Sequence, residues 1–290
     1  MKLTHIAQRE TKLLSILRQE LSLSSTLVKR LKYRNAFLVQ GQAVRTNHIV
    51  RVGDEVCVIM DEDTPEYPIE DAPIDILYED DALIAIDKPA GMLMHPSSAQ
   101  NEGTLANRLL GYYQKTGQAC AVHPVSRLDR DTFGVVLLAK NAHAHAKMHE
   151  MLMEQGLEKI YHAAVCGVPE VQEGLIDAPI ARRSPESLLR CVREDGKPAQ
   201  TRFRVLERKN GCALLELQPL TGRTHQLRVH CAHMGFPIAG DPQYGNDAFG
   251  LPYQQLCAVR LRFRHPLTEN FIEICTKQSV SLDFLQSDTV

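Results

Sequence analysis

Apolar and polar residues alternate along many segments of the chain after residue 73, and this period of two predicts β-strands. Residues 74–89 alternate on both sides of an acidic turn, which predicts a β-hairpin. Further strands are predicted at residues 134–140, 159–167, 199–208, 212–220, 256–263 and 270–276.

Apolar residues recur at helical spacing in three other segments, which predict helices at residues 104–117, 141–155 and 221–235. Thr221 or Thr224 is the expected cap of the last helix. Because strands outnumber helices and several are joined as hairpins, the predicted class is α+β, with a mixed, largely antiparallel sheet and flanking helices.

The beginning of the chain predicts a smaller α/β unit. Residues 22–37 predict a helix opened by a serine cap, residues 37–44 two short strands around Gly41, and residues 50–60 a further strand. The stretch after it holds three prolines and almost only acidic charge, so it should be extended and solvated. We therefore expect a module at 1–64, a linker at 65–73 and a larger domain at 74–290.

The formal net charge of -2 disguises an uneven distribution of charge. From Lys12 to Gly53 the only acid is Glu20, whereas Asp54 to Asp87 contains no Lys or Arg. The basic residues Lys29, Arg30, Lys32, Arg34 and Arg45 can contact RNA phosphates, or they can form an ordinary solvated face. The scarcity of acids and the strand–Gly–strand pattern that follows favour an RNA-binding surface.

Composition suggests a cytoplasmic protein. The longest apolar stretches fall short of the roughly 18 residues that span a bilayer, and charge precedes any hydrophobic run of signal-peptide length. The eight cysteines stand singly, so we expect them to be reduced and mostly buried.

A dense polar cluster from Ser126 to Thr132 leads through Gly134 into an apolar strand, which places charged side chains at the mouth of a sheet. Within it, Asp129 stands between two arginines. Such an aspartate is either a structural ion-pair partner or a carboxylate held ionised for catalysis. A second cluster places Arg228 near the start of a predicted helix, with His225 on the same face.

Three separated motifs together resemble the RluA/RluD-type pseudouridine synthases. They are R-L-D-R-D-T-x-G around Asp129, K-x-Y-x-A-x-V-x-G at 159–167 and T-G-R-T-H-Q-L-R-V-H at 221–230. The resemblance runs from about Ile74 to the end of the chain. The N-terminal module is similar to the RNA-binding module of ribosomal small-subunit protein four.

The resemblance implies an RNA pseudouridine synthase, acting most often on large-subunit ribosomal RNA and in some members on transfer RNA. It implies that Asp129 is the catalytic carboxylate and that Arg228 keeps it ionised, so we expect a salt bridge between them. It also implies that Tyr161 packs on the target base and receives or relays a proton, and that Arg127 fills the space left by the flipped base.

Two positions depart from the family pattern. Ser126 stands where members usually have His, and Phe133 stands where they usually have Ser. Neither replaces the carboxylate, so the departures bear on RNA contacts or substrate choice.

No cofactor is expected, because the reaction is an isomerisation without redox change or group donor. No metal is expected either: His145 and His149 share a helix face, but His143 points elsewhere and no acid or cysteine ligand is near. We expect a monomer.

Two other functions remain open: a catalytically idle RNA-binding or ribosome-assembly factor with the same fold, and a hydrolase acting through an aspartate. The hydrolase is the weaker alternative, because such enzymes normally use two carboxylates. A basic stretch lines the RNA path or forms a solvated loop, namely Arg182, Arg183, Arg190, Arg193, Lys197, Arg202 and Arg204.

Overall fold

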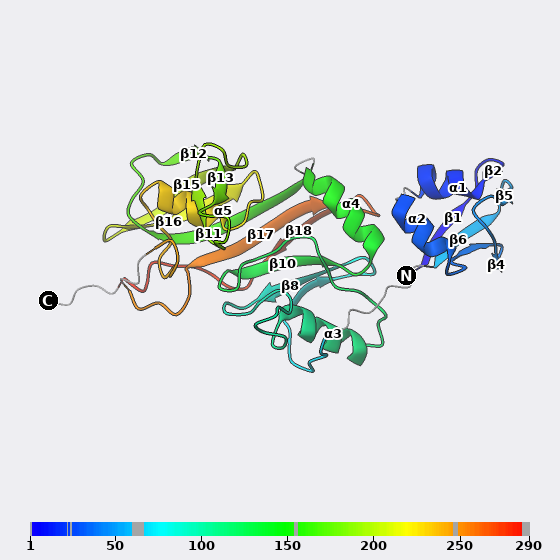
Figure 1. The fold of residues 1–290 in the computed structure, drawn as a ribbon, viewed down its shortest axis with the longest axis horizontal. Helices are drawn as coiled ribbons and strands as arrows, with labels where there is room; N and C mark the ends of the chain where they lie inside the picture. The colour runs from blue at the N-terminus through cyan, green and yellow to red at the C-terminus, as the bar shows by residue number, and fades with distance from the viewer. Residues whose placement is uncertain are drawn as a thin grey trace.

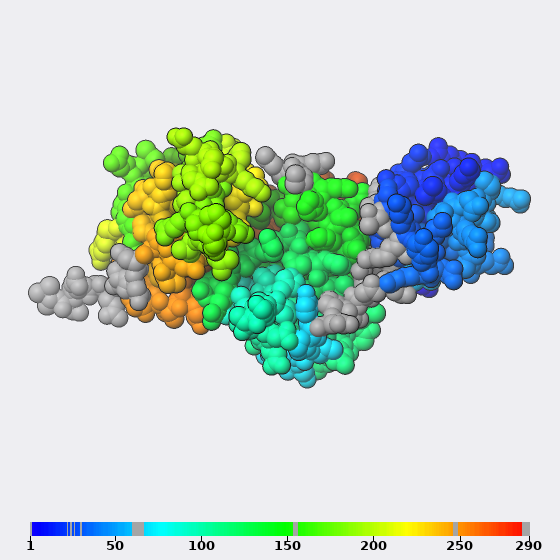
Figure 2. Space-filling model, in the orientation of Figure 1, coloured from blue at the N-terminus to red at the C-terminus, as the bar shows by residue number. Residues whose placement is uncertain are grey.

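The computed structural model describes residues 2–21, 23, 25–59, 67–153, 156–245 and 249–285. A small N-terminal unit and a larger unit built on one long sheet make up the chain (Figure 1). In the space-filling view of Figure 2 the N-terminal unit is blue, and the larger unit runs from cyan through green and yellow to orange. The two units share no strand among the described residues.

The N-terminal unit packs short helices on a four-stranded sheet of order β1-β6-β3-β4. Its strands are β1 (Lys2–Ile6), β3 (Phe37–Val39), β4 (Gln42–Ala43) and β6 (Glu55–Ile59), with β2 (Thr11–Lys12) paired to β5 (Ile49–Val50). Its helical segments are α1 (Leu13–Ser15), the π-helical η1 (Ile16–Glu20) and α2 (Ser25–Lys32). They enclose a core of their own that includes Leu13, Leu31 and Phe37.

The predicted hairpin around Gly41 is present, since β3 and β4 pair across it. Gln40 and Gly41 both have positive φ, at 50° and 76°, as tight hairpin turns require. The helix predicted over 22–37 is shorter, because Asn35 leaves the helical region with φ 51° and β3 begins at Phe37. The predicted serine cap falls on Ser22 or Ser24, which lie outside the described residues.

The linker residues 67–73 are extended as predicted, but they are packed on a helix rather than fully solvated. Asn107 Nδ2 donates to the carbonyl of Pro68 at 2.7 Å, and Arg108 lies 3.3 Å from Glu70. A Cβ on Gly111 would come within 2.1 Å of the Glu70 carbonyl, so only glycine fits there. Residues 65 and 66 of the predicted linker lie outside the described part of the chain.

The larger unit is built on a ten-stranded sheet whose main path is β12-β15-β16-β11-β17-β10-β8-β7. Only the β10–β17 pair among the described strands is parallel, so the predicted α+β class with a mixed, largely antiparallel sheet is confirmed. The last-synthesised strand of this path, β17, lies between β10 and β11 and joins the two halves of the sheet. The strands are β7 (Ile76–Glu79), β8 (Leu83–Lys88), β9 (His123–Pro124), β10 (Phe133–Ala139), β11 (Leu157–Cys166), β12 (Glu173–Asp177), β15 (Gln200–Lys209), β16 (Cys212–Pro219), β17 (Leu256–Arg264) and β18 (Phe271–Cys275).

Helices α3 (Leu105–Lys115), α4 (Ala142–Met153) and α5 (Gln226–His233) follow the three predicted helical segments, and β13 (Ile180–Arg182) pairs with β14 (Arg190–Val192) in a small separate hairpin. The start of α5 differs from the prediction. Its cap is His225, with φ 57° and no side-chain cap bond, so the expected threonine caps are wrong. Thr221 instead donates to the side chain of Gln226 at 2.8 Å.

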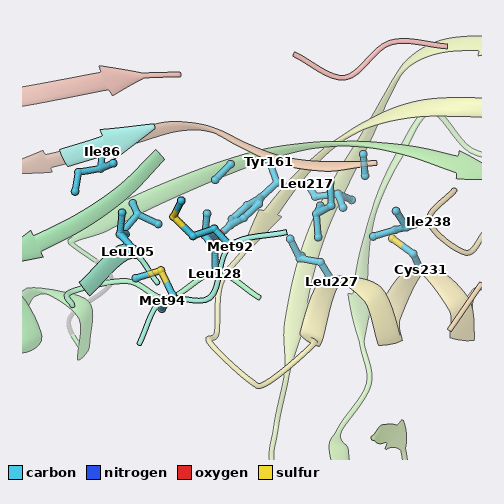
Figure 3. Packing of buried hydrophobic residues seen from close by; sticks show 14 of the residues in the cluster. Ile86, Met92, Met94, Leu105, Leu128, Tyr161, Leu217, Leu227, Cys231 and Ile238 are labelled. Carbon is cyan, nitrogen blue, oxygen red and sulfur yellow. The ribbon is translucent and has the colours of Figure 1, made fainter. Parts of the chain in front are cut away.

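The two faces of the sheet carry different clusters of buried side chains. Tyr161, Leu217 and Leu227 belong to the cluster drawn in Figure 3, whereas Phe133 packs with Cys257 in another cluster. The cysteines are free, as predicted, but Cys275 is exposed and four others are only partly buried, so the expectation of mostly buried cysteines is wrong. Among the described residues, no helix is long and apolar enough to cross a membrane.

Candidate active site

Asp129 lies in the loop that leads into β10, at the mouth of the sheet, as the sequence predicted. The amide of Thr132 donates to the Asp129 carbonyl at 3.2 Å, and Gln254 Nε2 donates to the Thr132 hydroxyl at 2.5 Å. Gly134, with φ 102°, lets β10 approach β17, since a Cβ there would lie 2.3 Å from the Ala258 carbonyl. The loop is therefore fixed from both ends.

Lys88, at the end of β8, connects the Ser126–Thr132 loop to the segment that follows β8. The side chain is fully buried, and Nζ donates to the carbonyls of Pro89, Met92 and Arg130 at 2.8–2.9 Å. Burial lowers the pKa of Lys88 to about 8, although the carboxylates of Asp131 and Asp129 oppose that shift. Lys88 was not predicted as part of the site, because a lysine is usually exposed.

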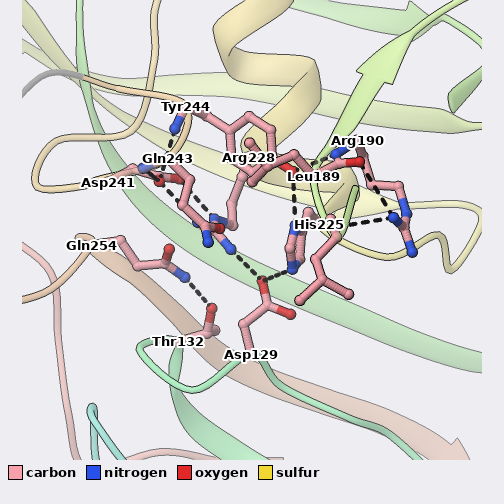
Figure 4. Close-up of polar contacts among 11 residues, drawn as sticks. Asp129, Thr132, Leu189, Arg190, His225, Arg228, Asp241, Gln243, Tyr244 and Gln254 are labelled. Atoms are coloured by element: carbon pink, nitrogen blue, oxygen red, sulfur yellow. Dashed lines mark hydrogen bonds and ion pairs between the residues drawn. The ribbon is translucent and has the colours of Figure 1, made fainter. Parts of the chain in front are cut away.

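The predicted salt bridge between Asp129 and Arg228 is confirmed. Arg228 Nη1 donates to Asp129 Oδ2 at 3.1 Å, across 99 positions of sequence (Figure 4). The Arg228 side chain is 6% exposed and the Asp129 side chain 31% exposed. Within the described part of the chain no hydrogen bond reaches Oδ1, so this oxygen is available to a substrate.

A second carboxylate, Asp241, fixes the plane of the guanidinium. Arg228 Nε and Nη2 donate to its two oxygens at 2.7 and 2.9 Å, and the Asp241 side chain is fully buried. Burial alone would raise the pKa of Asp241, but Arg228 and the backbone N–H groups of Gln243 and Tyr244 hold it below its ordinary value. This bidentate pair leaves Nη1 directed at Asp129.

The ring of Tyr244 covers the other side of the same guanidinium, with its centroid 4.9 Å from Arg228 Cζ. Its hydroxyl accepts from the backbone N–H of Arg190 at 2.8 Å and lies 2.8 Å from His225 Nδ1. Because that hydroxyl accepts from Arg190, it can donate its own proton to Nδ1. The remaining ring proton of His225 then lies on Nε2.

His225 therefore directs an N–H group toward the carboxylate of Asp129. Its Nε2 lies 4.0 Å from Asp129 Oδ2, too far for a direct hydrogen bond. Burial lowers the pKa of His225, and Arg228 and Arg190 add to the lowering against the opposing effect of Asp129. The histidine is thus neutral near pH 7. The sequence placed it on the face of Arg228 but gave it no role.

Tyr161 projects from β11 into the buried cluster beside Asp129, with Met92, Leu128 and Leu227 around it (Figure 3). Its side chain is 8% exposed. Burial and the Asp129 carboxylate raise the pKa of Tyr161, so the phenol is protonated at neutral pH. This environment favours packing against a base over acceptance of a proton.

Arg127 is an exposed residue of the Ser126–Thr132 loop. Burial lowers the pKa of His95, and the nearby charge of Arg127 lowers it further. The two departures from the family pattern leave the carboxylate clear. Ser126 is buried, and its hydroxyl accepts from the backbone N–H of Leu137 at 3.3 Å. Phe133 points into the other cluster, away from Tyr161.

The basic residues of the N-terminal module belong to a different unit from Asp129. Lys29, Lys32, Arg34 and Arg45 are exposed, and nothing is described of the Arg30 side chain.

In the histidine-rich helix α4, His143 is buried and the ring of His145 stacks on His123 with centroids 5.4 Å apart. No group of three metal-ligating side chains occurs among the described residues.

The loop before β10, strand β11 and helix α5 thus assemble a partly open carboxylate, a buried tyrosine and a clamped guanidinium. Such an arrangement is typical of enzymes that act through a single carboxylate.

Comparison with known proteins agrees with this class. The RNA pseudouridylate synthase family matches residues 82–233. An uncharacterised RNA pseudouridine synthase of Bacillus subtilis, YhcT, is 36% identical over 90% of this chain and 87% of its own. Ribosomal large subunit pseudouridine synthase D of Xanthomonas campestris is 37% identical over 80% of this chain and 74% of its own.

Solved structures of RNA pseudouridylate synthases are also similar to this chain. Human RNA pseudouridylate synthase domain containing 1 superposes with a TM-score of 0.60 at 27% identity, over 73% of this chain and 86% of its own. The chain belongs to the RNA pseudouridylate synthase family and is an isomerase that modifies RNA.

Proposed function

We propose that this protein converts specific uridines of structured RNA, with large-subunit ribosomal RNA as the first candidate, to pseudouridine through Asp129. The observation that carries the proposal is the Asp129–Arg228 pair, 3.1 Å long and clamped from behind by buried Asp241. Three separate segments of the chain are needed to build it. A catalytically idle descendant would have no need to keep this assembly.

The reaction breaks the bond between ribose C1′ and uracil N1, rotates the base and joins C1′ to C5, which releases the C5 hydrogen. One carboxylate can act in this sequence as nucleophile or base. Oδ1 of Asp129, which accepts no hydrogen bond from the described residues, is the oxygen that we assign to the substrate, and Arg228 pairs with Oδ2 at 3.1 Å. Tyr161 supports the base, and the Nε2–H of His225 is placed to donate to a substrate oxygen.

The target uridine is inaccessible while it is stacked in the RNA. It must flip into the pocket, at a cost of a few kcal/mol. We assign Arg127, an exposed residue of the Ser126–Thr132 loop, to the space that the flipped base leaves in the RNA stack.

The choice of ribosomal RNA rests on relatives named ribosomal large subunit pseudouridine synthase D, at 37–39% identity. Transfer RNA is the second candidate. A monomeric, cytoplasmic enzyme is part of this proposal, since RNA substrates of both kinds are found in the cytoplasm.

The test is hydrogen release from RNA that carries tritium at uridine C5. We expect release to match the number of pseudouridines formed, with the base retained. Release of free uracil would support the hydrolase instead. If no cellular RNA gave release, the protein would be an idle RNA-binding or assembly factor. Mapping pseudouridines in cells that lack the protein identifies the target.

The basic face of the N-terminal module gives a further prediction. Replacing Lys29, Arg30 and Lys32 together with glutamine should weaken RNA binding and reduce the slope of log affinity against log salt by about 2 to 3. A matched control replaces Lys115, Arg264 and Lys277, three exposed cations of the larger unit. If the salt slope of the module variant stayed at the wild-type value, these side chains would form only a solvated face.

A further inference from the structure

A cleft with a volume of about 480 Å³ lies between the β13–β14 hairpin, the turn at 195–197 and the loop at 222–224. This volume falls within the roughly 300–1,000 Å³ of typical small-molecule sites, so it admits a nucleotide-sized group. Four cationic side chains line it: Arg182, Arg190, Lys197 and Arg223. We call it the arginine cleft.

The positive charge of the arginine cleft is not neutralised by its own lining. Asp195 is the one acid in the lining, and it is paired with Arg193, which is not a lining residue. No carboxylate pairs with any of the four lining cations in the part of the chain that the structure describes. The charge of the cleft therefore suits an anionic ligand.

The arginine side chains are held in place by backbone carbonyls. Arg182 Nη1 donates to Pro185 at 3.0 Å, Arg190 Nη1 to Leu188 at 2.9 Å, and Arg223 Nε to Pro198 at 2.9 Å. Each guanidinium keeps further N–H groups for a ligand. Because these side chains are already ordered, little rotamer entropy is lost when an oxyanion binds.

The floor of the cleft is rigid as well. Ile180 and Lys197 exchange two backbone hydrogen bonds of 2.9 Å, which attach the turn to β13. A Cβ on Gly196 would lie 2.7 Å from the carbonyl carbon of Ile180, so the turn needs glycine. These contacts distinguish a built site from a loose basic loop.

The arginine cleft adjoins the catalytic carboxylate. Thr224 lines the cleft, and the next residue, His225, faces Asp129 at 4.0 Å. Arg190 is connected to the same histidine, because its backbone N–H donates to the Tyr244 hydroxyl that contacts the ring (Figure 4). A nucleotide held at Asp129 would thus have its neighbour in the chain near the cleft.

We propose that the arginine cleft binds the ribose-phosphate backbone of the RNA strand directly adjoining the target uridine. This inference rests on the proposed function. Flipping a uridine out of the stack spreads the phosphates on either side of it, and a rigid set of guanidinium groups can hold one of them in the spread position. The cleft thereby places the strand, while Asp129 acts on the extruded nucleotide.

The test combines cleft variants with altered RNA, in protein carrying Asp129→Asn so that no turnover occurs. The triple variant Arg182→Gln, Lys197→Gln, Arg223→Gln should bind substrate RNA about tenfold more weakly or worse, with a salt slope reduced by about 2. Substrate RNA with neutral methylphosphonates beside the target uridine should lose affinity for the unaltered cleft. The same RNA should lose little further affinity for the triple variant.

The controls separate the possible outcomes. The Lys115, Arg264 and Lys277 triple variant should retain full sensitivity to the methylphosphonates, and circular dichroism melting checks that each variant folds. If the methylphosphonates lowered the RNA affinity of the cleft variant as much as that of the control variant, the inference would be overturned. Equal binding of uridine 5′-monophosphate and RNA would also overturn it, since the site would then take free nucleotides. Both results leave the tritium-release test of synthase activity unaffected.

Discussion

Substitution of Asp129 by asparagine is expected to reduce pseudouridine formation on the order of 10⁴-fold or more, a loss typical of a principal catalytic residue. Asparagine keeps the size of the side chain but cannot act as a nucleophile or base at neutral pH. Tritium release from C5-labelled substrate RNA measures the loss. Filter binding or fluorescence anisotropy should show nearly unchanged RNA affinity, because phosphate contacts dominate binding.

The fold should survive this substitution. Arg228 remains paired with Asp241 through two hydrogen bonds, so no buried charge is left without a partner. Asp131→Asn is the matched control, since Asp131 is a partly buried carboxylate of the same loop. Its rate should stay close to that of the wild type. An Asp129→Asn enzyme that kept a tenth or more of the wild-type rate would remove Asp129 from the chemistry.

The largest effect on stability is expected from Asp241→Ala. The side chain is fully buried and accepts from Arg228 and from the backbone N–H groups of Gln243 and Tyr244. Its loss removes two hydrogen bonds from a guanidinium that is 6% exposed and leaves the partly exposed Asp129 as its remaining carboxylate partner. Breaking one partner of a buried pair costs about 3–5 kcal/mol. Urea unfolding should show a decrease of that size, and activity should fall because Nη1 is no longer directed at Asp129.

A double variant separates stability from function. Replacing Arg228 with Met and Asp241 with Leu removes both charges, so much of the free energy of unfolding should return. Activity should not return, since Asp129 has lost its cation. If Asp241→Ala unfolded at the same urea concentration as the wild type, the clamp would have no structural importance.

Low pH should destabilise the folded protein through the same carboxyl group, that of Asp241. The pKa of Asp241 is lower in the folded protein than its ordinary value. Its contribution to stability is therefore complete above that ordinary value and is lost as pH falls through the folded pKa. The wild type should lose stability on acidification more steeply than the double variant, which lacks this carboxyl group.

The sheet was largely predictable from the sequence because long strands carry the alternation that a buried face imposes. Strand β16 falls where the period of two placed it, and β10 falls where a continuous apolar run predicted a strand. The short strands β12, β13 and β14 were missed, since three to five residues hold too little pattern. The cap of α5 was also misplaced, because His225 adopts a left-handed conformation, which is uncommon for a residue other than glycine.

The candidate site was predictable only where a motif marked it. The Asp129–Arg228 pair followed from the resemblance of two motifs almost a hundred residues apart. Asp241 and Lys88 were missed as members of the site. Their importance depends on complete burial, which for a charged side chain comes from tertiary packing rather than from local sequence.

The position of β17 in the sheet has a consequence for the timing of biosynthesis. Asp129 precedes a strand of one half-sheet, Arg228 follows a strand of the other, and β17 (Leu256–Arg264) separates the halves. While the ribosome is still translating earlier codons, a nascent chain has both halves but no strand to join them. The two halves that carry Asp129 and Arg228 can therefore join only after β17 has emerged, so a nascent chain that stops before Leu256 should be unable to modify RNA.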